Sequence, residues 1–212
     1  MKTSPAIDLY WKMYVEPRFE RTALFTLLRQ QFACESVLYP GCSIHIAPSF
    51  VFPHVVYVDR SPEAIQFFAD TAAIQAYIDS KKKYKRSAYF RFIAQDYTLP
   101  LEEQSFDLLL ALFAGVISSV CKPYLKTGGL LVTNNSQGDA QQAANDPDFQ
   151  LMAVVRYQKK NYMLVKENPE LILAAANRDK TKHYLKQTSC GVQYTEEEDY
   201  FVFQKRPVRV FN

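Results

Sequence analysis

The segment from residue 36 to residue 62, SVLYPGCSIHIAPSFVFPHVVYVDRSP, constrains the fold of this chain more than any other. It holds two short apolar runs, Val37–Tyr39 and Val55–Val58, and the second is rich in β-branched residues, which favour strands. Neither run alternates polar and apolar residues, as is typical of strands covered on both faces. Gly41 follows the first run, and Asp59 ends the second. The segment therefore predicts a strand, a tight turn, a short irregular connection and a second strand.

Strands and helices alternate beyond this segment. Ser61, Pro62 and Glu63 supply an N-cap, a first-turn proline and an early acid, so a helix is expected from there to about Lys81. Further strands are predicted at 89–94, 106–112 and 130–133, with a helix at 115–125 that ends at a turn through Gly128 and Gly129. The alternation predicts the α/β class, with a doubly wound, mostly parallel Rossmann-like sheet.

The two ends of the chain have a different pattern. Residues 6–31 predict amphipathic helix interrupted near Pro17, which either packs on the sheet or forms a lid whose Tyr10, Trp11 and Tyr14 contact a substrate. After residue 140, a hairpin, a helix and an antiparallel terminal strand are predicted at 151–157 with 162–165, at 171–185 and at 200–204. We expect one domain, 1–212, comprising a helical segment 1–35, a core 36–135 and C-terminal elements 136–212.

Composition narrows the classes of function. At 212 residues and 48% hydrophobic, the chain can bury a substantial core, and its net charge of +3 does not by itself imply nucleic-acid or membrane binding. The basic run at 81–86, KKKYKR, could hold a phosphate backbone, but a solvated helix end is the preferred interpretation. Four scattered cysteines and three histidines predict neither a zinc site nor a disulfide framework. With no long apolar run and no signal peptide, a cytoplasmic protein is expected, without membrane or nucleic-acid partners.

Four pieces of sequence occur in an informative order. They are the turn Tyr39-Pro40-Gly41-Cys42-Ser43, the strand ending on Asp59, Ala94-Gln95-Asp96 followed by Ser105-Phe106-Asp107-Leu108, and Leu125-Lys126-Thr127-Gly128-Gly129-Leu130. In this order they resemble the class I S-adenosylmethionine-dependent methyltransferases, over residues 36–135 and with a divergent cofactor motif. The antiparallel terminal strand is compatible with that fold. The resemblance implies S-adenosylmethionine as cofactor and no metal.

The resemblance also implies a set of cofactor-binding residues. Gly41 would let the backbone approach the ligand, Asp59 would accept the ribose hydroxyls, and Asp96 would accept from the adenine amino group. Phe113 would pack near the adenine or the transferred methyl group. The full set is Tyr39, Gly41, Cys42, Ser43, Asp59, Arg60, Gln95, Asp96, Tyr97 and Phe113. No residue is identified as a catalytic base.

The turn departs from the family pattern. The family has an acid where this chain has Tyr39, and glycines where it has Ser43 and His45. Pro48 limits any helix after the turn, so that helix should be short or replaced by a loop. His45 could act as a base or fill the space left by a missing glycine, and space filling is the preferred interpretation.

Three functions follow from these observations. The first is a methyltransferase for a small-molecule acceptor, since the sequence after the fourth strand, Ala111–Gly115, lacks the Asn/Asp-Pro-Pro-aromatic signature of nucleic-acid amino methylation. The second is an inactive member of the fold that binds a ligand or partner. The third, a nicotinamide-dependent oxidoreductase, is disfavoured because Gly41 has no partner glycines. Whether the protein is an enzyme, and its oligomeric state, stay open at this point.

Overall fold

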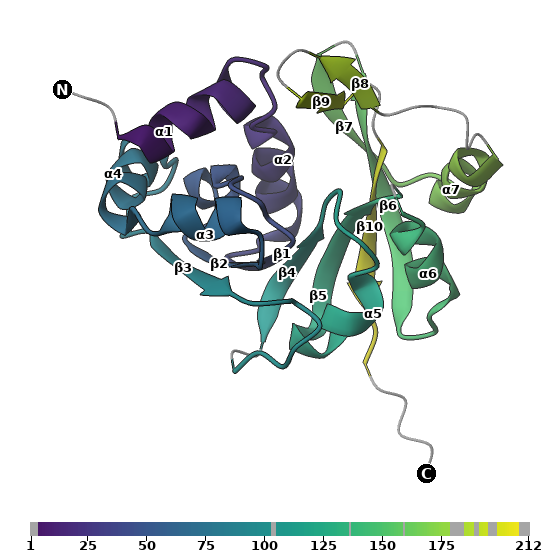
Figure 1. Ribbon diagram of the computed structural model, residues 1–212. Helices are drawn as coiled ribbons and strands as arrows, with labels where there is room; N and C mark the ends of the chain where they lie inside the picture. The colour runs from purple at the N-terminus through teal and green to yellow at the C-terminus, as the bar shows by residue number, and fades with distance from the viewer. Residues whose placement is uncertain are drawn as a thin grey trace. The chain divides into compact units, whose positions relative to one another are not determined.

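The computed structural model describes residues 4–102, 105–135, 137–158, 160–178, 185–188, 191–194 and 199–207. The chain forms two compact units, Met1–Leu101 and Glu102–Asn212. Each unit carries its own strands and helices (Figure 1).

Three parallel strands form the sheet of the first unit. They are β1 (Ser36–Pro40), β2 (His54–Asp59) and β3 (Tyr89–Ala94), in the order β3-β2-β1. Residues 37–40 and 55–58 are buried, as their continuous apolar runs predict. On β3, exposure alternates with half-burial over the first four residues, so this edge strand has one face open to solvent.

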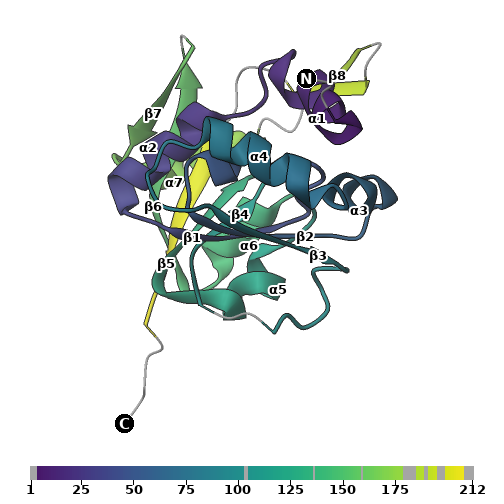
Figure 2. The same cartoon turned by 90° about the vertical axis from the view of Figure 1, so that its left-hand side faces the viewer.

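Helices cover one face of these three strands. α1 (Pro5–Tyr10) continues into a π-helical turn, η1 (Trp11–Val15), and α2 (Thr22–Phe32) follows, so the predicted interruption near Pro17 is confirmed. Viewed along the plane of the strands, α2, α3 (Pro62–Phe68) and α4 (Thr71–Lys81) lie on the same side of β1, β2 and β3 (Figure 2).

The single helix predicted from residue 62 to residue 81 is wrong. The structure has two helices, α3 (Pro62–Phe68) and α4 (Thr71–Lys81). The break falls at Asp70, whose side chain accepts a hydrogen bond from the backbone N–H of Ala73 at 3.3 Å and another from the Ser4 hydroxyl at 2.6 Å. An N-cap inside the apolar pattern starts a new helix and ends the old one.

The connection after the first turn is short, as expected. A 3₁₀ helix, η2 (Ala47–Phe50), stands where a full helix would otherwise follow β1. Tyr57 of β2 stabilises it from below, because its hydroxyl donates to the carbonyl of Ile46 at 3.1 Å and contacts the Ser49 hydroxyl at 2.7 Å.

The main sheet strands of the second unit follow the order β4-β5-β10-β6-β7. They are β4 (Phe106–Ala111), β5 (Leu125–Asn134), β6 (Phe149–Gln158), β7 (Asn161–Val165) and β10 (Asp199–Lys205). β4 and β5 are parallel, β10 is antiparallel to both β5 and β6, and β6 and β7 form the predicted hairpin. The α/β class, with parallel strands and an antiparallel terminal strand, is confirmed.

Helices and a small second sheet complete this unit. α5 (Ser118–Cys121) and η3 (Lys122–Tyr124) precede β5, α6 (Asp139–Asn145) follows it, and α7 (Pro169–Arg178) follows β7. β8 (Leu185–Thr188) and β9 (Gly191–Tyr194) pair with each other in antiparallel fashion. The predicted helix 171–185 is confirmed up to residue 178, and residues 179–184 lie outside the described part of the chain.

The helix predicted at 115–125 is too long. The structure places only α5 and η3 there, and residues 126–129 belong to β5 rather than to a turn before it. Phe106 pairs with Leu125 and Leu108 with Leu130, so the intervening residues bulge out of the ladder. Gly128, at φ +80°, supplies the positive φ within this bulge.

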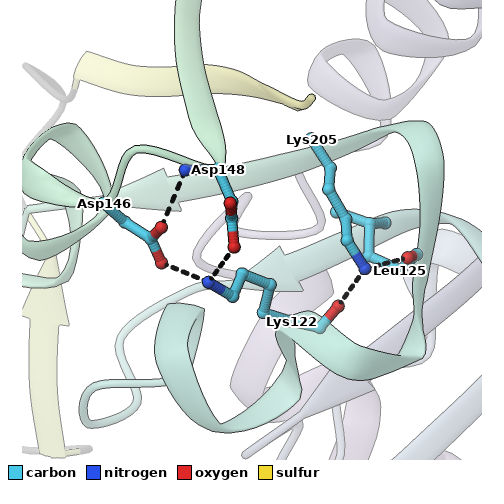
Figure 3. Close-up of polar contacts among 5 residues, drawn as sticks. All are labelled: Lys122, Leu125, Asp146, Asp148 and Lys205. Atoms are coloured by element: carbon cyan, nitrogen blue, oxygen red, sulfur yellow. Dashed lines mark hydrogen bonds and ion pairs between the residues drawn. The ribbon is translucent and has the colours of Figure 1, made fainter. Parts of the chain in front are cut away.

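A network of lysines and aspartates ties the end of β10 to the rest of the second unit (Figure 3). Lys205 Nζ donates to the backbone carbonyls of Lys122 at 2.9 Å and Leu125 at 2.7 Å. Lys122 Nζ in turn lies 2.8 Å from Asp146 and 2.7 Å from Asp148, at the junction of α6 and β6. The same residues therefore hold together the start of β5, the start of β6 and the end of β10.

Among the residues with described structure, no helix is long and apolar enough to cross a membrane.

Candidate functional site

The predicted site residues of the first unit lie where its parallel strands end. β1 ends at Pro40, β2 at Asp59 and β3 at Ala94, and parallel strands present these ends at one edge of the sheet. In open α/β sheets, ligands bind outside this edge. This edge carries the turn after β1, the end of β2 with Asp59 and Arg60, and the loop from Gln95 to Tyr97 after β3.

The turn after β1 is folded back against β2. Gly41 adopts φ +64°, and its N–H donates to the carbonyl of Val58 at 2.8 Å. Ser43 adopts φ +49°, a left-handed conformation that costs a non-glycine residue roughly 1–2 kcal/mol. Its N–H is directed at Asp59, and that contact compensates for the strain.

Two backbone N–H groups orient the carboxylate of Asp59 at this edge. Its Oδ2 accepts the N–H of Ser43 at 2.7 Å, and its Oδ1 accepts the N–H of Ser61 at 2.8 Å. Ser61 is also the N-cap of α3, so the carboxylate is held between the turn and the first turn of a helix. An ionised carboxylate has about four lone-pair sites, and these two contacts use one on each oxygen. The half-buried Asp59 can therefore accept further hydrogen bonds from a ligand.

Two of the three turn positions that depart from the family pattern, Tyr39 and His45, contact each other. The Tyr39 hydroxyl lies 3.1 Å from His45 Nδ1, and His45 Nε2 lies 3.1 Å from the carbonyl of Glu20. Because a carbonyl only accepts, Nε2 carries the proton and Nδ1 accepts from Tyr39. The ring of Tyr14 stacks on His45 with centroids 4.6 Å apart. The imidazole is buried, as the space-filling interpretation expects.

Burial decides the protonation of this cluster. It lowers the pKa of His45 to about 3, with a smaller effect in the same direction from the Arg21 guanidinium. Burial likewise raises the pKa values of Tyr39 and Cys42 well above their usual ranges. A group with so low a pKa is a weak base, and both nitrogens of His45 are engaged inside the protein, so these contacts favour the space-filling interpretation over a catalytic base.

Cys42 presents no exposed thiol at this edge. Its side chain is buried, and its Sγ lies 3.3 Å from the carbonyl of Ser43. Cys42 can therefore reach a ligand only through its backbone.

A second pair of predicted residues is joined across β2 and β3. Arg60 Nη1 lies 2.8 Å from Asp96 Oδ2, although the Arg60 side chain is exposed. Asp96 Oδ1 also accepts from the backbone N–H and the hydroxyl of Thr98, at 2.9 and 2.8 Å. These hydrogen bonds, with a smaller contribution from Arg60, lower the pKa of Asp96. Both residues were predicted from the sequence, whereas their ion pair is visible only in the structure.

The remaining predicted residues have other surroundings. Gln95 Nε2 donates to the carbonyls of Leu99 at 3.4 Å and Pro100 at 3.2 Å, so it supports the loop after β3, in which Tyr97 is half-buried. Phe113 belongs to the second unit. It adopts φ +58° directly after β4, and its N–H donates to Asn134 Oδ1 at 3.1 Å.

Sequence reasoning missed several of the groups that shape these two regions. The lid alternative places Tyr10 and Tyr14 against a substrate, but Tyr14 stacks on His45, and Tyr10 is fully buried with its hydroxyl 3.0 Å from Glu20. These contacts favour the packed helix over the lid for Tyr10. Glu20 acts through a backbone carbonyl, which no side-chain pattern can indicate. Asn134 follows an apolar strand, and that position at a strand end was its only signal.

The residues that the structure describes contain no cluster of three or more histidine, cysteine, aspartate or glutamate side chains suited to a metal ion.

Comparison with known proteins gives a likeness in structure alone. No family model matches the chain, and no curated protein matches it in sequence. A crystal structure from Klebsiella pneumoniae, assigned as an O-methyltransferase, matches with a TM-score of 0.52 at 11% identity over 98% of this chain and 92% of that one. The O-MT region of StiE, residues 961–1257, matches with a TM-score of 0.50 at 14% identity over 91% of this chain and 75% of that one. The chain therefore shares the Rossmann-like α/β fold of these methyltransferase structures.

Proposed function

We propose that this protein binds S-adenosylmethionine at the carboxyl edge of β1 to β3 and methylates a small-molecule acceptor. The observation that carries the proposal is the orientation of Asp59. Its carboxylate is fixed by two backbone N–H groups at 2.7 and 2.8 Å and keeps acceptor sites on both oxygens. A ribose presents two adjacent hydroxyl donors, which such a carboxylate can accept together.

The other residues of the site would serve binding and positioning. The backbone turn from Gly41 to Ser43 would lie against the ligand, with no Cβ at Gly41 to block its approach. Asp96, kept ionised by its hydrogen bonds from Thr98, would accept from the adenine amino group, and Arg60 would hold it in place. Gln95 and Tyr97 would support the same end through their loop.

S-adenosylmethionine, when bound, supplies a methyl group on a sulfonium centre, which an acceptor attacks in line. The part of the reaction left to the protein is alignment of the acceptor, which can lower the barrier substantially. Because burial makes His45 a weak base and both its nitrogens are engaged, it is not suited to take a proton from the acceptor. We therefore propose an acceptor that is already deprotonated or that loses its proton to water.

The altered turn favours a second candidate, a nucleoside-binding protein that does not transfer a methyl group. Tyr39 occupies the position of the acid that supports the cofactor's amino group in the family, and its hydroxyl is committed to His45. The contact between His45 and the carbonyl of Glu20 closes the same end of the turn. A ligand held by its nucleoside alone would fit these residues.

Calorimetric titration of the full chain with S-adenosylmethionine and S-adenosylhomocysteine tests the first step. Binding should weaken at least roughly tenfold for the 2′-deoxyribose analogue, because one hydrogen bond to Asp59 is lost. Asp59→Asn should weaken binding similarly, whereas Asp107→Asn, which removes an acid paired with Lys126 in the second unit, should not. Equal affinity for the ribose and deoxyribose ligands would show that Asp59 does not bind the sugar.

Turnover separates the two candidates. Incubation with S-adenosylmethionine and a panel of small phenols, carboxylic acids and amines should release S-adenosylhomocysteine if the protein is a methyltransferase. Binding without release across the panel supports the second candidate. Absence of binding to either ligand contradicts both.

A further inference from the structure

A basic surface lies at the edge of the first unit opposite to the candidate site. It consists of Arg29 from α2 and of Lys81, Lys82, Lys83, Lys85 and Arg86 at and after the end of α4. Two carboxylates pair with it, Asp79 with Lys82 at 2.7 Å and Glu35 with Arg86. Six cations against two acids leave an excess of four positive charges, which is more than the +3 of the whole chain.

The cations of this basic surface are held in place by the fold. The Tyr84 hydroxyl donates to the carbonyl of Ser49 at 2.8 Å, which fixes the centre of the loop. Arg29 Cζ and Lys82 Nζ lie 5.5 and 5.9 Å from the centroid of the Tyr84 ring, within the range of cation–π attraction. Arg29 Nη1 also donates to the carbonyl of Val51 at 2.6 Å. The cations of α2 and of the loop after α4, which are distant in sequence, therefore lie side by side around Tyr84.

The basic surface lies away from the candidate site around Asp59 and Asp96. The backbone N–H of Lys83 donates to the carbonyl of Phe50 at 2.8 Å, just before β2, and the loop leads into the first residue of β3. It therefore lies at the amino ends of β2 and β3. Asp59 and Asp96 follow the carboxyl ends of the same strands.

Exposed rings lie next to the cations. Tyr89 begins β3 directly after the loop, is 48% exposed, and pairs with His54 at the start of β2, with ring centroids 4.6 Å apart. Arg91, also exposed, lies two residues further on the same face of the strand. The opposite face of β3 is covered, since Phe92 stacks on Phe68 of α3 at 4.2 Å. No helix forms between Gln95 and Leu101, so within this unit the face carrying Tyr89 stays open.

We propose that this surface binds single-stranded nucleic acid, with the basic loop on the phosphates and Tyr89 stacked on a base. Proteins bind single strands without sequence preference through basic side chains that contact the phosphates and through exposed aromatic rings that stack on the bases. A membrane surface fits less well, because within residues 81–91 Tyr89 is the only large apolar side chain that is exposed. An aliphatic side chain that could enter the acyl region is lacking there. The nucleic acid would bind at this edge of the first unit. The methyl acceptor would bind at the opposite edge, near Asp59.

Fluorescence anisotropy of labelled oligouridine and oligothymidine, each about 12 nucleotides long, tests the proposal on the full chain. We expect micromolar binding at about 50 mM salt that weakens severalfold or more at about 200 mM, because counterions are released from the strand. The double variant Lys81→Glu/Lys85→Glu replaces two exposed lysines and should weaken binding at least roughly tenfold. Tyr89→Ala should weaken it about tenfold while keeping the salt slope, since it removes stacking but no charge.

The matched control makes the same change of charge elsewhere. Lys160→Glu/Lys166→Glu alters two exposed lysines of the second unit and should leave binding within about twofold. Equal losses in both double variants would show an effect of net charge alone and overturn the proposal. Vesicles of phosphatidylserine and phosphatidylcholine form the other arm, and binding to them without binding to the oligonucleotides overturns it too. Nucleoside binding at Asp59 is measured separately, so either proposal can fail without the other.

Discussion

At the scale of single residues, Asp59 at the end of β2 and His45 in the turn after β1 have opposite consequences. Asp59 meets the backbone N–H of Ser43 and keeps acceptor sites for a ligand, whereas His45, two residues further, uses both its nitrogens inside the protein. The difference is burial. A half-buried carboxylate with backbone donors stays available, while a buried imidazole must satisfy both nitrogens internally.

The buried His45 predicts a pH-dependent stability. Burial holds the pKa of His45 at about 3 in the folded protein, against its ordinary value of 6.5, so between these two pH values the unfolded chain binds more protons. Its contribution to stability is complete above pH 6.5 and falls by up to about 1.4 kcal/mol per pH unit as the pH drops toward 3. Urea denaturation at several pH values measures this slope. His45→Gln, which can still donate to Glu20 and accept from Tyr39 but does not titrate, should flatten it.

His54 provides the comparison for that experiment. It is an exposed histidine in the same unit, so His54→Gln should leave the slope near that of the unsubstituted protein. Equal slopes for the protein and for His45→Gln would mean that the imidazole is not held neutral.

At the scale of elements, local sequence predicted where most strands lie and was less reliable for helices. The strands came out close to the expected bounds because their apolar runs are short and bounded by turn residues. The helix errors have a common cause. Asp70 and the residues after Gly115 form caps and turns whose partners, such as Ser4 and Asp139, lie far away in sequence.

Asp139, at the start of α6, is the clearest such partner. Its buried Oδ1 accepts the N–H groups of Ile117 at 3.1 Å and Ser118 at 2.9 Å, and its Oδ2 accepts the Thr133 hydroxyl at 3.0 Å. Asp139→Ala should lower the free energy of unfolding by about 2–4 kcal/mol, because these donors lose a charged acceptor. Asp139→Asn, whose amide oxygen can still accept both N–H groups, should lose less. Equal losses in the two variants would argue against the capping role.

At the scale of the whole molecule, the second unit depends on the end of the chain. β10 lies between β5 and β6, so two strands that come earlier in the sequence are joined by one of the last. Such long-range pairing costs loop-closure entropy before its contacts form. The Lys205 contacts at the end of β10 compensate for part of this cost.

Removing those contacts should destabilise the protein measurably. Lys205→Met keeps most of the side chain's packing but deprives the carbonyls of Lys122 and Leu125 of a donor, with an expected loss of about 1–2 kcal/mol. Lys126→Met removes only a partly exposed pair with Asp107 and should cost less than about 1 kcal/mol. Chemical denaturation of both variants measures the difference. A smaller loss for Lys205→Met than for Lys126→Met would contradict this role.

The sequence by itself determined the order of strands and turns, the positive φ at Gly41 and Gly128, and the carboxylate at the end of β2. These features follow from neighbours a few residues apart, through apolar runs, glycine conformations and caps. Only the tertiary structure decided that His45 would bond to Glu20, that Arg60 would pair with Asp96, and that Arg29 would join the loop around Tyr84. Each of these contacts joins residues at least 25 positions apart, because burial and charge pairing depend on which segments the fold brings together.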